Sequence, residues 1–199
     1  MSSNSTRPRW TLLLALLPAW VLTGCATTPQ STLTVTSVQS QQTFKPQFDS
    51  AYASRSAEGD YDVVLTGDAG PAGAAGEDVR QVMHVRVVYR PMRGTRLDHP
   101  SATNASIRWY VLGSRPGDVV EYTGAGFVTV KPAAVGDGVE VNVRNASLRP
   151  VAAGGNLTDP LGPTTVEGTF QARDNPERVG ELLAQVAAAS GATRSASAR

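Results

Sequence analysis

The chain has 199 residues, of which 41% are hydrophobic and 18% are charged, and this composition predicts one globular domain with additional terminal segments. Its formal charge is only +1. Since nucleic-acid-binding proteins attract phosphates through an excess of Lys and Arg, we expect no nucleic-acid partner, and the single cysteine excludes an intramolecular disulfide.

Residues 1–24 have the features of a secretory signal peptide. Arg7 and Arg9 precede an apolar run over residues 10–22, and no acidic residue lies among the first nine. The run is interrupted by Pro18 and is shorter than the roughly 20 apolar residues that span a bilayer. We therefore expect this segment to be removed, which changes the formal charge of the chain to −1.

The end of this segment, Leu22-Thr23-Gly24-Cys25, resembles the lipobox of bacterial lipoproteins, in which a branched apolar residue, a small residue and Gly or Ala precede the lipid-modified Cys. The resemblance covers the first 25 residues and implies cleavage before Cys25, a diacylglycerol on its sulfur and frequent acylation of its amino group. Two or three acyl chains hold a protein at a bilayer, whereas one does so only marginally. The alternative, a buried or reactive thiol, does not fit a signal-peptide setting. Because Ala26 rather than Asp follows the Cys, the resemblance also implies sorting to the outer membrane of a Gram-negative cell.

Residues 25–31 form the predicted lipidated N-terminus and linker, which is small and polar after the Cys. Six residues beyond Cys25 can extend by roughly 20 Å. The globular domain is expected to cover residues 32–190, and no family resemblance is recognised in it.

Apolar residues alternate with polar ones in much of this domain, which is typical of strands with one buried face. The alternation predicts about eight short strands, around Leu33–Val35, Tyr61–Leu65, Met83–Tyr89, Ile107–Val111, Val120–Tyr122, Phe127–Val130, Val139–Val143 and Val166–Phe170.

Turn residues separate these strands, and no helical pattern lies between them. Turns are predicted at Gly124-Ala125-Gly126, at Gly136-Asp137-Gly138, at Arg115–Asp118 and at Asp159–Pro163. Consecutive strands without intervening helices favour a mainly β fold, either an antiparallel β-sandwich or a small barrel.

A long connection between two of the predicted strands holds Arg90, Arg93 and Arg96. Long loops are often functional, and arginine guanidinium groups suit phosphate and carboxylate ligands. Together with Arg86 and Arg108, which we place on the polar side of the flanking strands, the loop forms a hypothetical patch that binds an anion or a partner. The alternative is a solvated loop whose arginines pair with nearby carboxylates.

One helix is predicted over residues 175–190. Asp174 or Asn175 can cap it, Pro176 suits its first turn, and Val179, Leu182, Leu183 and Val186 share one face. Residues 191–199 carry no large apolar side chain, and we expect them to be disordered.

The two histidines, His84 and His99, show no metal-binding spacing, so no metal and no cofactor are expected. His84 lies on the polar side of its strand and is interpreted as exposed or as the cross-strand partner of a carboxylate. Asp98 and His99 are adjacent in the arginine-containing loop, which leaves an envelope enzyme with a loop-built site as the alternative function.

The sequence thus predicts a lipoprotein of the outer membrane that faces the periplasm and is held by acyl chains on Cys25. We expect it to be a non-catalytic binding or assembly module whose partner is an envelope protein, a glycan or an anionic lipid headgroup.

Overall fold

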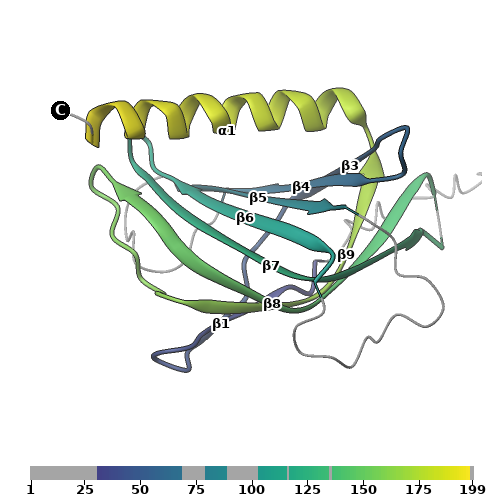
Figure 1. The fold of residues 1–199 in the computed structure, drawn as a ribbon, viewed down its shortest axis with the longest axis horizontal. Helices are drawn as coiled ribbons and strands as arrows, with labels where there is room; N and C mark the ends of the chain where they lie inside the picture. Colours follow the sequence, from purple (N-terminus) through teal and green to yellow (C-terminus); the bar gives the residue numbers. More distant parts are fainter. Residues whose placement is uncertain (1–30, 69–78, 89–102, 116, 135, 198–199) are drawn as a thin grey trace, which may run out of the picture.

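A computed structural model describes residues 31–68, 79–88, 103–115, 117–134 and 136–197. The described residues form nine strands and one C-terminal helix, which confirms the predicted mainly β fold (Figure 1). In chain order these elements are β1 (Thr34–Ser37), β2 (Thr43–Phe44), β3 (Ser50–Arg55), β4 (Tyr61–Gly67), β5 (Arg80–Val87), β6 (Ala105–Leu112), β7 (Val119–Pro132), β8 (Gly138–Gly154), β9 (Thr164–Asp174) and α1 (Pro176–Ser197).

The strands form one sheet that closes on itself. Its order is β2-β1-β9-β3-β4-β5-β6-β7-β8, and β9 also pairs with β8, so that β3 to β9 make a complete ring. Along one edge β9 pairs with β8, and its other edge is shared by antiparallel β1 and parallel β3. Of the two architectures predicted, the pairings correspond to the small barrel rather than to two separate sheets.

Alternate residues of every long strand fill the interior of this ring. Trp109 and Tyr122 are fully buried there, and their rings stack with centroids 5.1 Å apart. The buried amide of Gln81 accepts a hydrogen bond from the Trp109 indole N–H (3.3 Å) and donates one to the Gln47 carbonyl (2.8 Å). The interior is therefore a packed apolar core in which the buried Gln81 amide has hydrogen-bond partners.

A second core lies outside the ring, where α1 covers part of the sheet (Figure 1). Val179, Leu182 and Val186 of α1 pack against an outward-facing set of sheet residues, Val64, Val82, Tyr110 and Val119. Because β4 is covered on both faces, its consecutive residues Val63, Val64 and Leu65 are all completely buried, a pattern that alternation alone does not predict.

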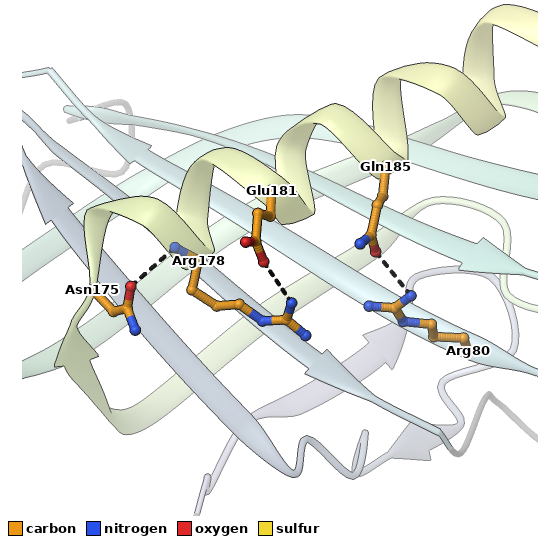
Figure 2. Close-up of polar contacts among 5 residues, drawn as sticks. All are labelled: Arg80, Asn175, Arg178, Glu181 and Gln185. Atoms are coloured by element: carbon orange, nitrogen blue, oxygen red, sulfur yellow. Dashed lines mark hydrogen bonds and ion pairs between the residues drawn. The ribbon is translucent and has the colours of Figure 1, made fainter.

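Polar contacts hold α1 in place, as Figure 2 shows. The Asn175 side-chain oxygen accepts a hydrogen bond from the Arg178 backbone N–H (3.0 Å), which is the expected N-terminal cap. One turn along, the Arg178 guanidinium is 2.7 Å from the Glu181 carboxylate. Further along, Arg80 of β5 donates to the Gln185 side-chain oxygen (3.2 Å) and so ties the helix to the sheet.

The C-terminal end of α1 differs from the prediction. The helix continues past Ser190 to Ser197, so the expected disordered tail is wrong for residues 191–197. A glycine inside a helix costs only about 1 kcal/mol relative to alanine, and Gly191 is followed by residues such as Ala192 that favour helix. Adding residues to an existing helix needs no new nucleation, which explains why Gly191 does not end it.

The predicted turn at Gly124–Gly126 is also wrong, because these residues lie inside one continuous strand, β7. A Cβ atom at Gly124 would overlap the Ser147 carbonyl oxygen, and one at Gly126 would overlap the Ala146 side chain. Next to these glycines, β8 shifts its register both in its pairing with β7 and in its pairing with β9. Asn145, at the shift in β8, has a φ of 49°. The glycines therefore permit the close approach of two strands where the sheet bends.

Candidate functional site

Charged side chains gather on the outer face of β4, β5 and β6, beside the part covered by α1. In the strand register His84 lies opposite Arg108, and Arg86 lies opposite both Asp62 and Ser106. The intervening residues, such as Val63, Val85 and Ile107, are completely buried in the ring, so the charged side chains point outward. We call Asp62, His84, Arg86 and Arg108 the outer polar cluster.

The best-defined contact of this cluster joins His84 and Asp62. The His84 Nε2 atom is 2.7 Å from the Asp62 Oδ1 atom, and the side chains are 17% and 33% exposed. The hydrogen bond from His84 lowers the pKa of Asp62 below its ordinary value, and the charges of His84 and Arg86 act in the same direction against the effect of partial burial. The interpretation of His84 as a cross-strand partner of a carboxylate is confirmed.

The cluster continues toward α1 through Tyr110 and Glu121, which lie opposite each other on β6 and β7. Glu121 is only 5% exposed. Burial raises the pKa of Tyr110; the nearby Glu121 carboxylate adds to this increase, whereas Arg108 opposes it. Charged and polar groups thus extend from the exposed sheet surface to the edge of the second core.

The structure brings together two of the five predicted anion-binding residues. Arg86 and Arg108 are both exposed, lie on neighbouring strands and point outward from the same face. Arg90, Arg93 and Arg96 belong to the connection between β5 and β6 and lie outside the described residues. The same holds for Cys25 and for the pair Asp98 and His99.

A second candidate site is a hollow at one end of the ring, which we call the end hollow. Its volume is about 620 Å³, and it lies between the β3–β4 hairpin and the β7–β8 hairpin. Arg55, Tyr61, Asp137 and Asp174 contribute to its walls. The Arg55 guanidinium carbon lies 5.8 Å from the centre of the Tyr61 ring, a distance at which a cation is attracted to the ring face.

The end hollow has no local signal in the sequence, because its residues come from three distant parts of the chain. Tyr110 and Glu121 could have been paired in advance. The turn that joins β6 and β7 is short, with Asp118 N–H donating to the Arg115 carbonyl (3.1 Å), and counting back from a short turn gives the register of a hairpin.

These arrangements favour binding of charged groups. Two outward guanidinium groups can donate several hydrogen bonds to a phosphate or a carboxylate. In the described part of the chain, no group of three or more His, Cys, Asp or Glu side chains is placed to hold a metal ion.

Comparisons with protein-family models, with curated proteins and with solved structures each find no match to this chain. Among the residues that the structure describes, no helix has the length and apolar character required to cross a membrane.

Proposed function

We propose that the protein is a lipid-anchored lipoprotein of the cell envelope that acts as a non-catalytic binding or assembly module. Cys25, at the end of the lipobox-like Leu22-Thr23-Gly24-Cys25, carries the acyl chains, and Ala26 directs the protein to the outer membrane, facing the periplasm. The tether leaves the domain free to bind a second envelope component.

The observation that carries the binding role is the placement of Arg86 and Arg108. Both guanidinium groups are exposed on one outer face, whereas the interior of the ring is filled by side chains such as Trp109, Tyr122 and Phe170, which are at most 2% exposed. Since the ring encloses a packed core, a partner is bound on the surface. The preferred partner is anionic: an acidic glycan, a lipid headgroup or an acidic protein surface.

The pair formed by Asp62 and His84 supports this use of the outer polar cluster. Their 2.7 Å contact engages the Asp62 carboxylate, which lies opposite Arg86 in the strand register. A carboxylate already bonded to His84 competes less for the guanidinium groups of Arg86 and Arg108, so these keep donors for a ligand.

The test compares tagged full-length proteins expressed in the envelope. Cys25→Ser is expected to remove acylation and cleavage at residue 25 and to shift the protein away from the lipidated membrane fraction, measured by fractionation and by intact mass. Arg86→Gln combined with Arg108→Gln is expected to leave lipidation unchanged and to lower by at least tenfold the phosphate-containing and acidic material that is captured with the protein after chemical cross-linking.

A matched control replaces two exposed arginines of β8 and β9, Arg144→Gln with Arg173→Gln, which removes the same charge from another part of the sheet. If this control loses as much bound material as the Arg86 and Arg108 variant, the binding is nonspecific and the outer polar cluster is not the site. If Cys25→Ser is cleaved and fractionates like the wild type, the lipid anchor is contradicted.

A further inference from the structure

The end hollow combines charges of both signs at one end of the ring. Arg55 at the end of β3 supplies a guanidinium group, and Asp137 in the β7–β8 turn and Asp174 at the end of β9 supply two carboxylates. Ala53, Tyr61 and Val139 add apolar surface. The volume of about 620 Å³ falls within the roughly 300–1,000 Å³ of small-ligand pockets.

The direction of the strands places this hollow at the end of the domain from which the tether extends. β9 runs toward Asp174, and β1 is antiparallel to it, so the start of β1 is its end nearest to the hollow. Thr32 is bonded to Thr169 (2.9 Å from the Thr32 N–H to the Thr169 carbonyl), five residues before Asp174. At about 3.3 Å per residue this separation is roughly 17 Å along the strand.

The linker between Cys25 and Thr32 limits how far the domain can lie from its anchor. Its six residues extend by at most roughly 20 Å. Both hairpins that border the hollow lie at the right-hand end of the ring in Figure 1, near the start of α1. An acylated Cys25 therefore keeps this end of the ring within reach of the bilayer surface.

The hollow offers charges of both signs, which suit the two ends of a zwitterionic group. A phosphate accepts hydrogen bonds from the Arg55 guanidinium, and a primary ammonium donates to the carboxylates of Asp137 and Asp174. A quaternary ammonium has no N–H to donate and is recognised by aromatic faces, and here the Tyr61 face lies beneath Arg55. The chemistry that fits is a phosphate joined by a short link to a primary ammonium.

We propose that the end hollow binds the phosphoethanolamine headgroup of a membrane lipid. The inference depends on the proposed function in one respect, since the anchor at Cys25 brings the hollow to the lipid surface. Binding of the headgroup would orient the domain on the membrane with the β3–β4 and β7–β8 hairpins toward the bilayer.

The first arm of the test measures the headgroup alone and requires no anchor. The full-length protein in nonionic detergent is titrated by calorimetry with glycerophosphoethanolamine, glycerophosphocholine and glycerol phosphate. We expect the ethanolamine compound to bind at least tenfold more tightly than the other two. Arg55→Gln should weaken the binding of glycerophosphoethanolamine at least tenfold, and so should the double variant Asp137→Asn with Asp174→Asn. Arg173→Gln, on the outward side of β9, should leave this binding unchanged.

The second arm identifies the source of the headgroup. The lipidated protein is reconstituted in phosphatidylcholine vesicles that contain a phosphatidylethanolamine with a photoreactive group near its glycerol. We expect labelling to concentrate in peptides that carry Arg55–Tyr61 or Asp137–Val139 and to fall at least fivefold in Arg55→Gln. Circular dichroism of each variant checks that the fold is retained.

Three outcomes would overturn the proposal. Equal affinity for the three soluble compounds would show that the hollow does not recognise the ammonium. Unchanged affinity in the Arg55 and aspartate variants would place the binding elsewhere. Binding of glycerophosphoethanolamine without labelling in vesicles would assign the hollow to a soluble phosphoethanolamine compound rather than to a lipid. Retention of membrane anchoring by Cys25→Ser, by contrast, would contradict the proposed function and would leave the calorimetric result unaffected.

Discussion

At the scale of residues, polar side chains of the sheet have specific partners that hydrophobic alternation does not identify. His84 contacts Asp62 across the β4–β5 pairing, and the Asn104 side chain exchanges two hydrogen bonds with the backbone of Val128 (2.7 and 2.8 Å) inside the sheet. The sequence could show that His84 lies on the polar side, but not which carboxylate it meets. That choice depends on a register set across a long connection.

The pKa of Asp62 leads to a prediction about stability and pH. Because its folded pKa is below the ordinary value of 3.8, the carboxylate stabilises the fold above that pH, and this contribution is lost as the pH falls through the folded pKa. We expect Asp62→Asn to lower the free energy of unfolding at pH 7 by about 0.5–1 kcal/mol, a small effect because the pair is partly exposed. The difference from wild type should disappear in acid, as measured by urea unfolding between pH 7 and pH 2.

Asp68→Asn provides the control, because Asp68 is exposed at the end of β4. It should leave the free energy of unfolding nearly unchanged at every pH. A difference between Asp62→Asn and wild type that stays constant down to pH 2 would show that the ionised carboxylate is not what stabilises the fold at this position.

At the scale of elements, local pattern predicted most strands but not their limits. The sequence predicts two separate strands at Val120–Tyr122 and Phe127–Val130, because glycine between apolar runs usually indicates a turn. In the structure both are parts of the single strand β7. β3 was missed because its inward residues, Ala51 and Ala53, are too small to give a clear hydrophobic alternation. The two-residue β2 is too short for any periodicity.

Two glycine replacements are expected to have opposite effects on stability, because Gly124 lies where β7 and β8 approach closely and Gly180 lies on the open side of α1. Gly124→Ala places a methyl group against the Ser147 carbonyl and should lower the free energy of unfolding by about 2 kcal/mol. At Gly180, on the open side of α1, an added Cβ atom would meet no neighbouring element within 4 Å, and Gly180→Ala should raise the free energy of unfolding by up to about 1 kcal/mol because alanine favours helix. Denaturant unfolding measures both. A stabilising Gly124→Ala would mean that the strands do not approach so closely.

At the scale of the whole molecule, β9 joins elements from both ends of the domain. It pairs with β1, β3 and β8. Helix α1 follows directly after it and packs on the outer face of the ring, against residues of β4, β5, β6 and β7. The inner core and the second core share β4, β5, β6 and β7 as a common wall. Closure of the ring and docking of α1 are therefore expected to be lost together on unfolding.

Phe170→Leu tests this coupling, because Phe170 is a β9 residue of the inner core and is 2% exposed. We expect a loss of about 1 kcal/mol in the free energy of unfolding and a lower Tm. Outside the predicted signal peptide Trp109 is the only tryptophan, so its fluorescence reports on the interior, and far-ultraviolet circular dichroism reports on α1. In wild type and variant alike, the two signals should change at one midpoint.

Val151→Ala is the control, since this side chain is 48% exposed. Its Tm should match that of the wild type. Separate midpoints for Trp109 fluorescence and helical signal would contradict the coupling and show that α1 detaches before the ring opens.

The sequence by itself determined the features that short-range chemistry controls. Alternation predicted strands because one face must be buried, and Asn175 with Pro176 predicted the start of α1 because the first turn needs a cap. Only the tertiary structure decided which strands pair, that the sheet closes through β9, and which charged residues meet. Partner choice across connections such as 68–79, which joins β4 to β5, depends on how the whole core packs. Neither the Asp62–His84 contact nor the end hollow with Arg55, Asp137 and Asp174 therefore has a local signal.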